Sequence, residues 1–195
     1  LMPDEDQDEA IYILNDGHPL PNMRSLYCAG IDSYDQDKSD TSSSLGAMVV
    51  RTKQHSIPNY PQMTPVCLIR TRPSRKEKFY EMCGMVSVAY NLLGNTLIDY
   101  GKPLVIEWYK SNGLERYLAK RPRKFESENS EQMHEYGVHL NTFSKPQMVG
   151  LLQTYYYDHS ENIWFRDMID EALKYNTQDK ESDQDTVDAL GVALM

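Results

Sequence analysis

Residues 25–32 read Ser-Leu-Tyr-Cys-Ala-Gly-Ile-Asp, an apolar run of strand-forming residues that ends on a carboxylate. A polar, turn-rich stretch follows over residues 33–44, and a second apolar run, Leu-Gly-Ala-Met-Val-Val, occupies residues 45–50. Two such runs around a polar loop predict an antiparallel pair of strands. A third strand is expected over residues 65–71, which read Pro-Val-Cys-Leu-Ile-Arg-Thr. The chain therefore opens on an antiparallel sheet with Asp32 at the end of its first strand.

Helical periodicity replaces the strand pattern over residues 74–93. Phe79, Met82, Cys83 and Val86 fall on one face of a helix with 3.6 residues per turn. The same periodicity recurs in the last third of the chain. Further helices are expected over residues 144–157, 163–175 and 185–194.

A nearly continuous apolar run, Lys-Pro-Leu-Val-Ile-Glu-Trp, occupies residues 102–108. This composition predicts a strand that is buried on both faces of a sheet. A short helix over 113–119, a charged surface loop over 122–135 and a short strand over 136–141 are expected to follow. The expected order is three strands, a helix, a strand and then mostly helices. This order predicts a mixed α/β domain around one sheet.

The length of 195 residues fits one domain of ordinary size. We expect an acidic, flexible lead-in over residues 1–24 and a single domain over residues 25–195. No apolar run approaches the roughly 20 residues that cross a bilayer, and no secretion leader is visible, so the expectation is a cytoplasmic protein without a membrane partner. The three cysteines are far apart in the sequence and are expected to be buried free thiols.

Three acidic residues occupy positions that favour a metal site. Asp32 closes the first strand, Glu107 lies at the end of the expected strand over 102–108, and Asp185 opens the last helix. A carboxylate at the end of a buried strand is costly unless it is paired or binds a cation. Hard oxygen ligands suit Mg²⁺ or Mn²⁺. Two such ions about 4 Å apart would activate a water and stabilise a leaving oxygen in phosphodiester hydrolysis.

Each acid also has a simpler interpretation. Asp32 fits the capping of a turn, and Asp185 fits the start of a helix, where aspartate is favoured. Glu107 would point to solvent if its strand alternated between a buried and an exposed face. The hypothesis of a metal site therefore depends on all three side chains meeting at one edge of the sheet.

Several motifs resemble the nuclease domain of the large terminase subunit of tailed bacteriophages. The sequence Ala-Gly-Ile-Asp ending at Asp32, with the polar loop through Asp40 and the strand over 45–50, is similar to that family's opening hairpin. The sequence Leu-Val-Ile-Glu ending at Glu107 resembles its second acidic motif. The sequence Asp-Gln-Asp-Thr-Val-Asp over residues 183–188 resembles the third, although His-Asp is commoner where Asp-Gln stands here.

The resemblance implies a ribonuclease-H-like α/β fold, with a mixed sheet, an antiparallel first hairpin and flanking helices. It implies a metal-dependent endonuclease that cuts concatemeric viral DNA during genome packaging, with little sequence preference and with two divalent metal ions. The catalytic acids would be Asp32, Glu107 and Asp185, with Asp188 as an additional metal ligand and Asp40 as an accompanying acid. Either Asp185 or Asp188 fits as the third ligand, and we prefer Asp185 because it occupies the second-aspartate position of the motif.

The resemblance also implies partners. Double-stranded DNA is the expected substrate, in the host cell cytoplasm, and the portal and the small terminase subunit are candidate partners. The chain contains no GxxxxGK[ST] phosphate-binding loop, so the ATPase motor domain is expected elsewhere on the same polypeptide. Two alternatives stay open: a Holliday-junction resolvase or integrase-like nuclease of the same fold, and a non-catalytic interaction module.

The net charge of −9 argues against attraction of nucleic acid by the protein as a whole. Basic residues nevertheless bunch locally, between Arg70 and Lys78 and between Lys120 and Lys124. Guanidinium groups bind phosphate through two hydrogen bonds, so the first of these runs is a candidate contact for the DNA backbone. The simpler interpretation is a solvated start of a helix.

Overall fold

The computed structural model describes residues 11–14, 23–34, 45–99, 103–122, 136–176 and 184–195. Its centre is one five-stranded sheet in the order β1-β4-β3-β2-β5. Strands β2, β3 and β4 form an antiparallel meander, and β5 pairs parallel to β2. The predicted antiparallel hairpin is therefore confirmed. The strands are β1 (Ile11–Ile13), β2 (Tyr27–Asp32), β3 (Gly46–Thr52), β4 (Pro65–Thr71) and β5 (Thr96–Ile98).

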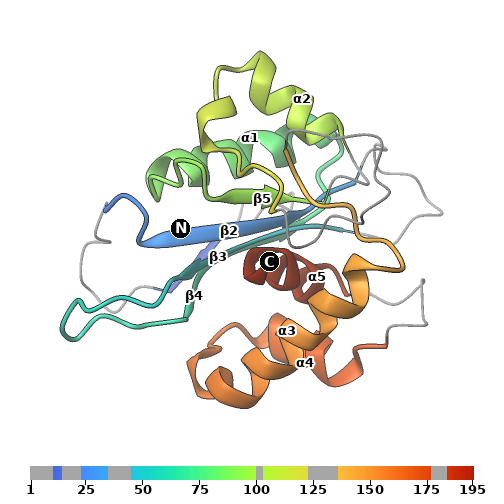
Figure 1. Ribbon diagram of the computed structural model, residues 1–195. Coiled ribbons are helices and arrows are strands. Elements are labelled where there is room, and N and C mark those ends of the chain that lie inside the picture. The colour runs from blue at the N-terminus through green and yellow to red at the C-terminus, as the bar shows by residue number, and fades with distance from the viewer. Residues whose placement is uncertain (1–10, 15–22, 35–44, 100–102, 123–135, 177–183) are drawn as a thin grey trace.

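Helices cover both faces of the sheet (Figure 1). Helices α1 (Lys76–Ala89) and α2 (Leu104–Ser111) lie on one side. On the other side lie α3 (Ser144–His159), α4 (Arg166–Lys174) and α5 (Asp185–Leu194), with α5 directly against β2 and β3. Short 3₁₀ turns occur at Glu115–Tyr117 and Ser160–Asn162. The result is a three-layer arrangement, which confirms the mixed α/β class.

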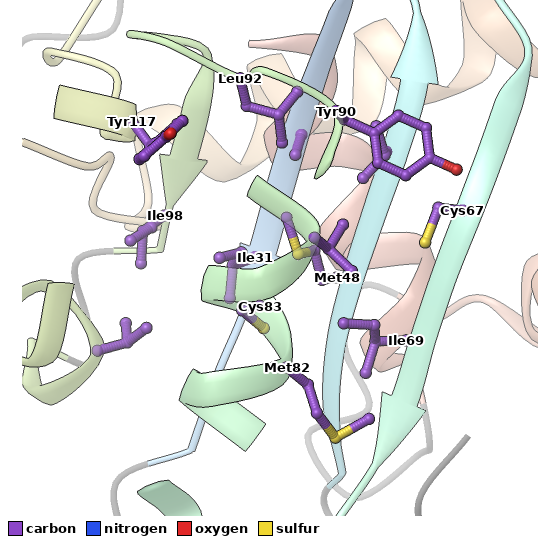
Figure 2. Close-up of a cluster of buried hydrophobic side chains, with 14 of the residues drawn as sticks. Ile31, Met48, Cys67, Ile69, Met82, Cys83, Tyr90, Leu92, Ile98 and Tyr117 are labelled. Atoms are coloured by element: carbon purple, nitrogen blue, oxygen red, sulfur yellow. The ribbon is translucent and has the colours of Figure 1, made fainter. Parts of the chain in front are cut away.

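Each face of the sheet has its own hydrophobic core. The core under α1 and α2 contains Ile31, Met48, Ile69, Cys83 and further buried side chains that Figure 2 shows between the strands and α1. The core on the opposite face joins the sheet to α3, α4 and α5. Alternating residues of one strand enter opposite cores, as the two-residue repeat of a strand requires. Members of the second core include Ala47, Val49, Leu97, Met148, Leu152, Val187 and Leu190.

The predicted strand over residues 102–108 is wrong, because residues 104–108 form the first part of helix α2. Val105, Ile106 and Tyr109 are buried whereas Glu107 is exposed, which is the pattern of one helical face. A short apolar run fits a strand and a buried helix equally well, so its hydrophobicity alone could not decide between them. The strand that joins the sheet is β5, only three residues long and nearer the N-terminus.

The outer edge of β5 is covered by backbone from two later segments. The amide of Ala119 donates to the carbonyl of Thr96 at 2.7 Å, and the amide of Val138 donates to that of Ile98 at 2.8 Å. The expected strand over 136–141 is thus reduced to isolated bridges. Pro122 begins the predicted loop over 122–135 and lies in no regular element, and the rest of that loop lies outside the described residues.

Strand β1 falls within residues 1–24, the expected lead-in, and Ile11–Ile13 pairs antiparallel with β4 at the sheet edge. Cys28, Cys67 and Cys83 are buried free thiols, as predicted. No helix in the described part of the chain is long and apolar enough to cross a membrane.

Candidate functional site

Two carboxylates follow directly on register-paired residues of the parallel strands β2 and β5. Ile31 pairs with Ile98, and the next residues are Asp32 and Asp99. The amide of Asp99 donates to the carbonyl of Ile31 at 3.0 Å, so the pairing continues to this point. Adjacent strands lie about 4.8 Å apart. The backbones of Asp32 and Asp99 are therefore immediate neighbours at the carboxyl ends of their strands.

Alternation along the strands indicates which face these acids share. Ile31 and Ile98 belong to the core under α1, so the residues after them turn toward the opposite face. Cys28 lies four residues before Asp32, so the two side chains are expected on the same face of the sheet. The Cys28 thiol donates to the carbonyl of Ala193 in α5 at 3.6 Å, which identifies this face as the one that α5 covers. Asp32 is 7% exposed. The face that carries α5 is therefore the face toward which Asp32 and Asp99 are directed.

Helix α5 crosses β2 in the opposite direction and carries Asp185 to the same end. Cys28 contacts Ala193, whereas a Cβ on Gly30 would lie 2.1 Å from the carbonyl oxygen of Ala189. Residue numbers along α5 therefore decrease in the direction in which those along β2 increase. Asp185 comes about one helical turn before Ala189, so it lies near the end of β2 that carries Asp32. Its Oδ2 accepts a hydrogen bond from the amide of Leu45 at 3.2 Å.

Leu45 immediately precedes β3, in which Ala47 is the register partner of Asp32. Asp185 is buried, with 8% of its surface exposed. Asp32, Asp99 and Asp185 thus arrive at one edge of the sheet from three different elements. Two strand ends and the start of one helix therefore meet at this edge, and Glu107 is not among the residues that the structure brings there.

Asp188, one turn into α5, lies on the side of this edge that faces α3 and α4. The Tyr175 hydroxyl donates to its Oδ1 at 2.8 Å, and Lys145 Nζ lies 3.9 Å from its Oδ2. Burial, the charge of Asp188 and the hydrogen bond to it raise the pKa of Tyr175, and the charge of Asp32 adds to this shift. Tyr175 therefore remains a protonated donor at neutral pH, within the electrostatic reach of both aspartates.

Glu107, the expected second acid, is not positioned by a strand. It lies on the exposed face of α2, a helix that packs against α1 in the layer opposite to α5 (Figure 1). Asp99, which the sequence analysis did not single out, follows β5 directly and lies beside Asp32. A signal was present, because Thr96-Leu-Ile-Asp99 is a short apolar run that ends on an acid, as residues 25–32 do.

The chemistry of this edge is that of hard oxygen donors. Aspartate side chains dominate it, and such groups suit Mg²⁺ or Mn²⁺ rather than softer ions. Within the described ranges, no three aspartate, glutamate, histidine or cysteine side chains converge closely enough to form a ready-made ion site. Asp40, the expected accompanying acid, lies outside those ranges.

The first basic run is only partly available for a ligand. Arg70 Nε lies 2.8 Å from Glu171 Oε1, so this guanidinium already forms an ion pair with a carboxylate of α4. Arg72 is buried, with its guanidinium 5.0 Å from the ring centre of Tyr34. The hypothesis of a DNA contact is therefore not supported for these two arginines, whereas Arg75 and Lys78 at the start of α1 are exposed.

The fold is similar to that in the crystal structure of the large terminase nuclease from the thermophilic phage G20c with bound zinc, with a TM-score of 0.57 and 14% sequence identity. The similarity covers 86% of this chain and 79% of that one. No protein-family model matches the sequence, and no curated protein matches it. The chain therefore has the ribonuclease-H-like fold seen in a large terminase nuclease.

Proposed function

We propose that this chain is a metal-dependent endonuclease that hydrolyses the phosphodiester backbone of double-stranded DNA. Asp32, Asp99 and Asp185 are the proposed ligands of two divalent cations, Mg²⁺ or Mn²⁺. The observation that carries the proposal is the meeting of two parallel strand ends and the start of α5 at one edge of the sheet. Asp99 takes the place that the sequence-based hypothesis gave to Glu107.

The residues at this edge fit a cation by their chemistry. Neighbouring carboxylates repel one another by charge, and a bound divalent cation would offset this repulsion. When bound, such an ion supplies a Lewis acid and a water of lowered pKa to phosphodiester hydrolysis. Asp32, Asp99 and Asp185 would hold the ion against the sheet, and the Leu45 amide orients one oxygen of Asp185.

Asp188 is proposed as an additional ligand on the outer side of the site. Its Oδ1 is oriented by the Tyr175 hydroxyl, and Lys145 partly balances its charge. Lys145, whose Nζ lies 3.9 Å from Asp188 Oδ2, is proposed to attract a DNA phosphate to this side of the site. No side chain in this arrangement is needed as a covalent nucleophile.

The biological setting is inferred from the fold. A similar fold in a phage large terminase nuclease supports a role in cutting viral DNA during packaging. An ATPase motor domain on the same polypeptide, the portal and the small terminase subunit are the partners that this role would involve. These partners belong to the proposal together with the substrate.

Cleavage of supercoiled plasmid in millimolar Mn²⁺ tests the proposal. The parent protein is expected to produce nicked and linear DNA, and EDTA is expected to stop the reaction. Asp32→Asn, Asp99→Asn and Asp185→Asn should each lower the rate by at least about 100-fold, because removal of one group that stabilises a transition state typically costs about 10²–10³.

Glu107→Gln is the matched control, since it removes an exposed carboxylate from α2 without touching the sheet edge. It should cut at about the parent rate. Plasmid that stays intact in Mn²⁺ would contradict the proposed activity. Loss of cutting in Glu107→Gln, together with normal cutting in Asp99→Asn, would instead restore Glu107 as the second acid.

A further inference from the structure

Glu171 is a buried carboxylate of α4 that contacts the first turn of α5. It is 6% exposed. Its Oε2 accepts a hydrogen bond from the amide of Thr186 at 2.8 Å and a second from the hydroxyl of the same residue at 2.5 Å. The amide of Val187 lies 3.4 Å from the same oxygen. One carboxylate oxygen thus receives donors from two consecutive residues that follow Asp185.

These contacts replace a local cap. The first amides of a helix have no partner within the helix, and a side chain of the N-cap residue commonly accepts from one of them. Gln184, at the N-cap of α5, makes no such bond. Glu171 accepts from this turn instead, and its negative charge also favours the positive end of the helix dipole. The start of α5 is therefore fixed by a residue of another helix.

The second oxygen of Glu171 connects this contact to the sheet. Arg70 Nε, from β4, lies 2.8 Å from Oε1. A buried carboxylate needs both a counter-charge and hydrogen bonds to offset its lost hydration. Arg70 supplies the charge and one hydrogen bond, and Thr186 and Val187 supply the others. The sheet, α4 and α5 are thereby joined at a single side chain.

We propose that Glu171 is a positioning residue, which holds the first turn of α5 so that Asp185 stands opposite Asp32 and Asp99. The inference rests on the proposed metal site, and it adds a residue that contacts neither a cation nor DNA. Tyr175, just after α4, supports the same turn through Asp188. A displacement of about 1 Å at a reacting centre can cost about 100-fold in rate, so this support bears directly on function.

Mn²⁺ affinity tests the inference without any need for DNA cleavage. Free Mn²⁺ is followed by electron paramagnetic resonance during titration of the parent protein, Glu171→Gln and Glu171→Ala. Residues that orient metal ligands typically contribute about 10- to 100-fold in metal affinity, and we expect a loss of that size in Glu171→Ala. Glu171→Gln keeps an acceptor oxygen for Thr186, so its loss should be smaller.

Asp170→Asn is the matched control, because Asp170 is the neighbouring acid on α4 and, within the described part of the chain, pairs only with Arg166 at an exposed position. Its Mn²⁺ affinity should equal that of the parent. Hydrogen exchange provides the second readout: the amides of Thr186 and Val187 should exchange faster in both Glu171 variants than in Asp170→Asn. If Glu171→Ala does not fold, the Mn²⁺ affinity of Glu171→Gln, compared with that of the parent, tests the inference.

The outcomes separate this inference from the proposed function. If both Glu171 variants bind Mn²⁺ as the parent does, Glu171 has no positioning role, even if their thermal stability falls. If the parent binds Mn²⁺ but leaves plasmid intact, the nuclease proposal fails while the affinities still decide the role of Glu171. A parent protein that binds no Mn²⁺ overturns both.

Discussion

Substitution of Gly30 by alanine should displace the helix that carries Asp185. Gly30 lies in the middle of β2, and a Cβ there would stand 2.1 Å from the Ala189 carbonyl oxygen and 2.4 Å from the Ala193 amide nitrogen. Ordinary van der Waals contact begins at 3.4 Å. The helix must therefore move by more than about 1 Å, because both contacts are with backbone and no side chain can rotate away.

The energetic consequence follows from this overlap. Overpacking of a core typically costs about 1–3 kcal/mol, and we expect the upper end of this range because the obstacle is rigid. For a chain of this length, about 3 kcal/mol corresponds to a fall in Tm of about 6–12 °C. The same displacement should lower plasmid cleavage by about 100-fold in the molecules that remain folded.

Urea unfolding followed by circular dichroism measures the stability change. Gly150→Ala is the matched control, since Gly150 lies within α3 and a Cβ there would meet nothing within 4 Å. That substitution should stabilise the protein by about 0.5–1 kcal/mol through helix propensity. A Gly30→Ala protein within about 1 kcal/mol of the parent would refute the close approach of α5 to β2.

Three other predictions follow from burial. Burial raises the pKa of all three cysteines, that of Cys67 to about 12, so a thiol reagent at about pH 8 should modify none in the native protein and all three after unfolding. Leu190→Ala should lower the free energy of unfolding by about 2–5 kcal/mol in a urea titration, whereas Leu173→Ala, at an 81% exposed position, should change it by less than about 0.5 kcal/mol. Burial also raises the pKa of several tyrosines, so the native state holds protons that the unfolded state releases above about pH 10, and stability should fall with pH beyond that point. In an alkaline titration, the phenolate absorbance of these tyrosines should therefore rise together with unfolding rather than before it. The tyrosines with a raised pKa are Tyr27, Tyr90, Tyr109, Tyr155, Tyr156 and Tyr175.

The antiparallel part of the sheet could be predicted from the sequence because its signals are long and local. Strands β2 and β3 are six and seven residues long, are mostly apolar, and lie on either side of a segment with a polar sequence. The position of Asp32 at the end of β2 could be predicted from the first run, because the apolar pattern ends at this residue. The helix over 185–194 could also be predicted, because Val187, Leu190 and Leu194 recur at helical spacing in the sequence. Local pattern was sufficient for these elements.

The place of Asp99 beside Asp32 could not be found in this way. Strand β5 has three residues, too few to show any periodicity, and its place beside β2 depends on pairing with a segment more than 60 residues earlier in the chain. The longer apolar run over residues 102–108 was the stronger signal for a buried strand, but residues 104–108 lie in helix α2. The support of α5 by Glu171 is likewise invisible in sequence, because Glu171 and Thr186 are brought together only by tertiary packing.

A crystal of the protein soaked in Mn²⁺ provides the most direct measurement of the proposed site. Anomalous scattering locates the ion independently of any assumption about the ligands. We predict two peaks about 4 Å apart between Asp32, Asp99 and Asp185. Peaks beside Glu107, or an absence of peaks at the carboxyl ends of β2 and β5 under conditions that support cleavage, would contradict the account.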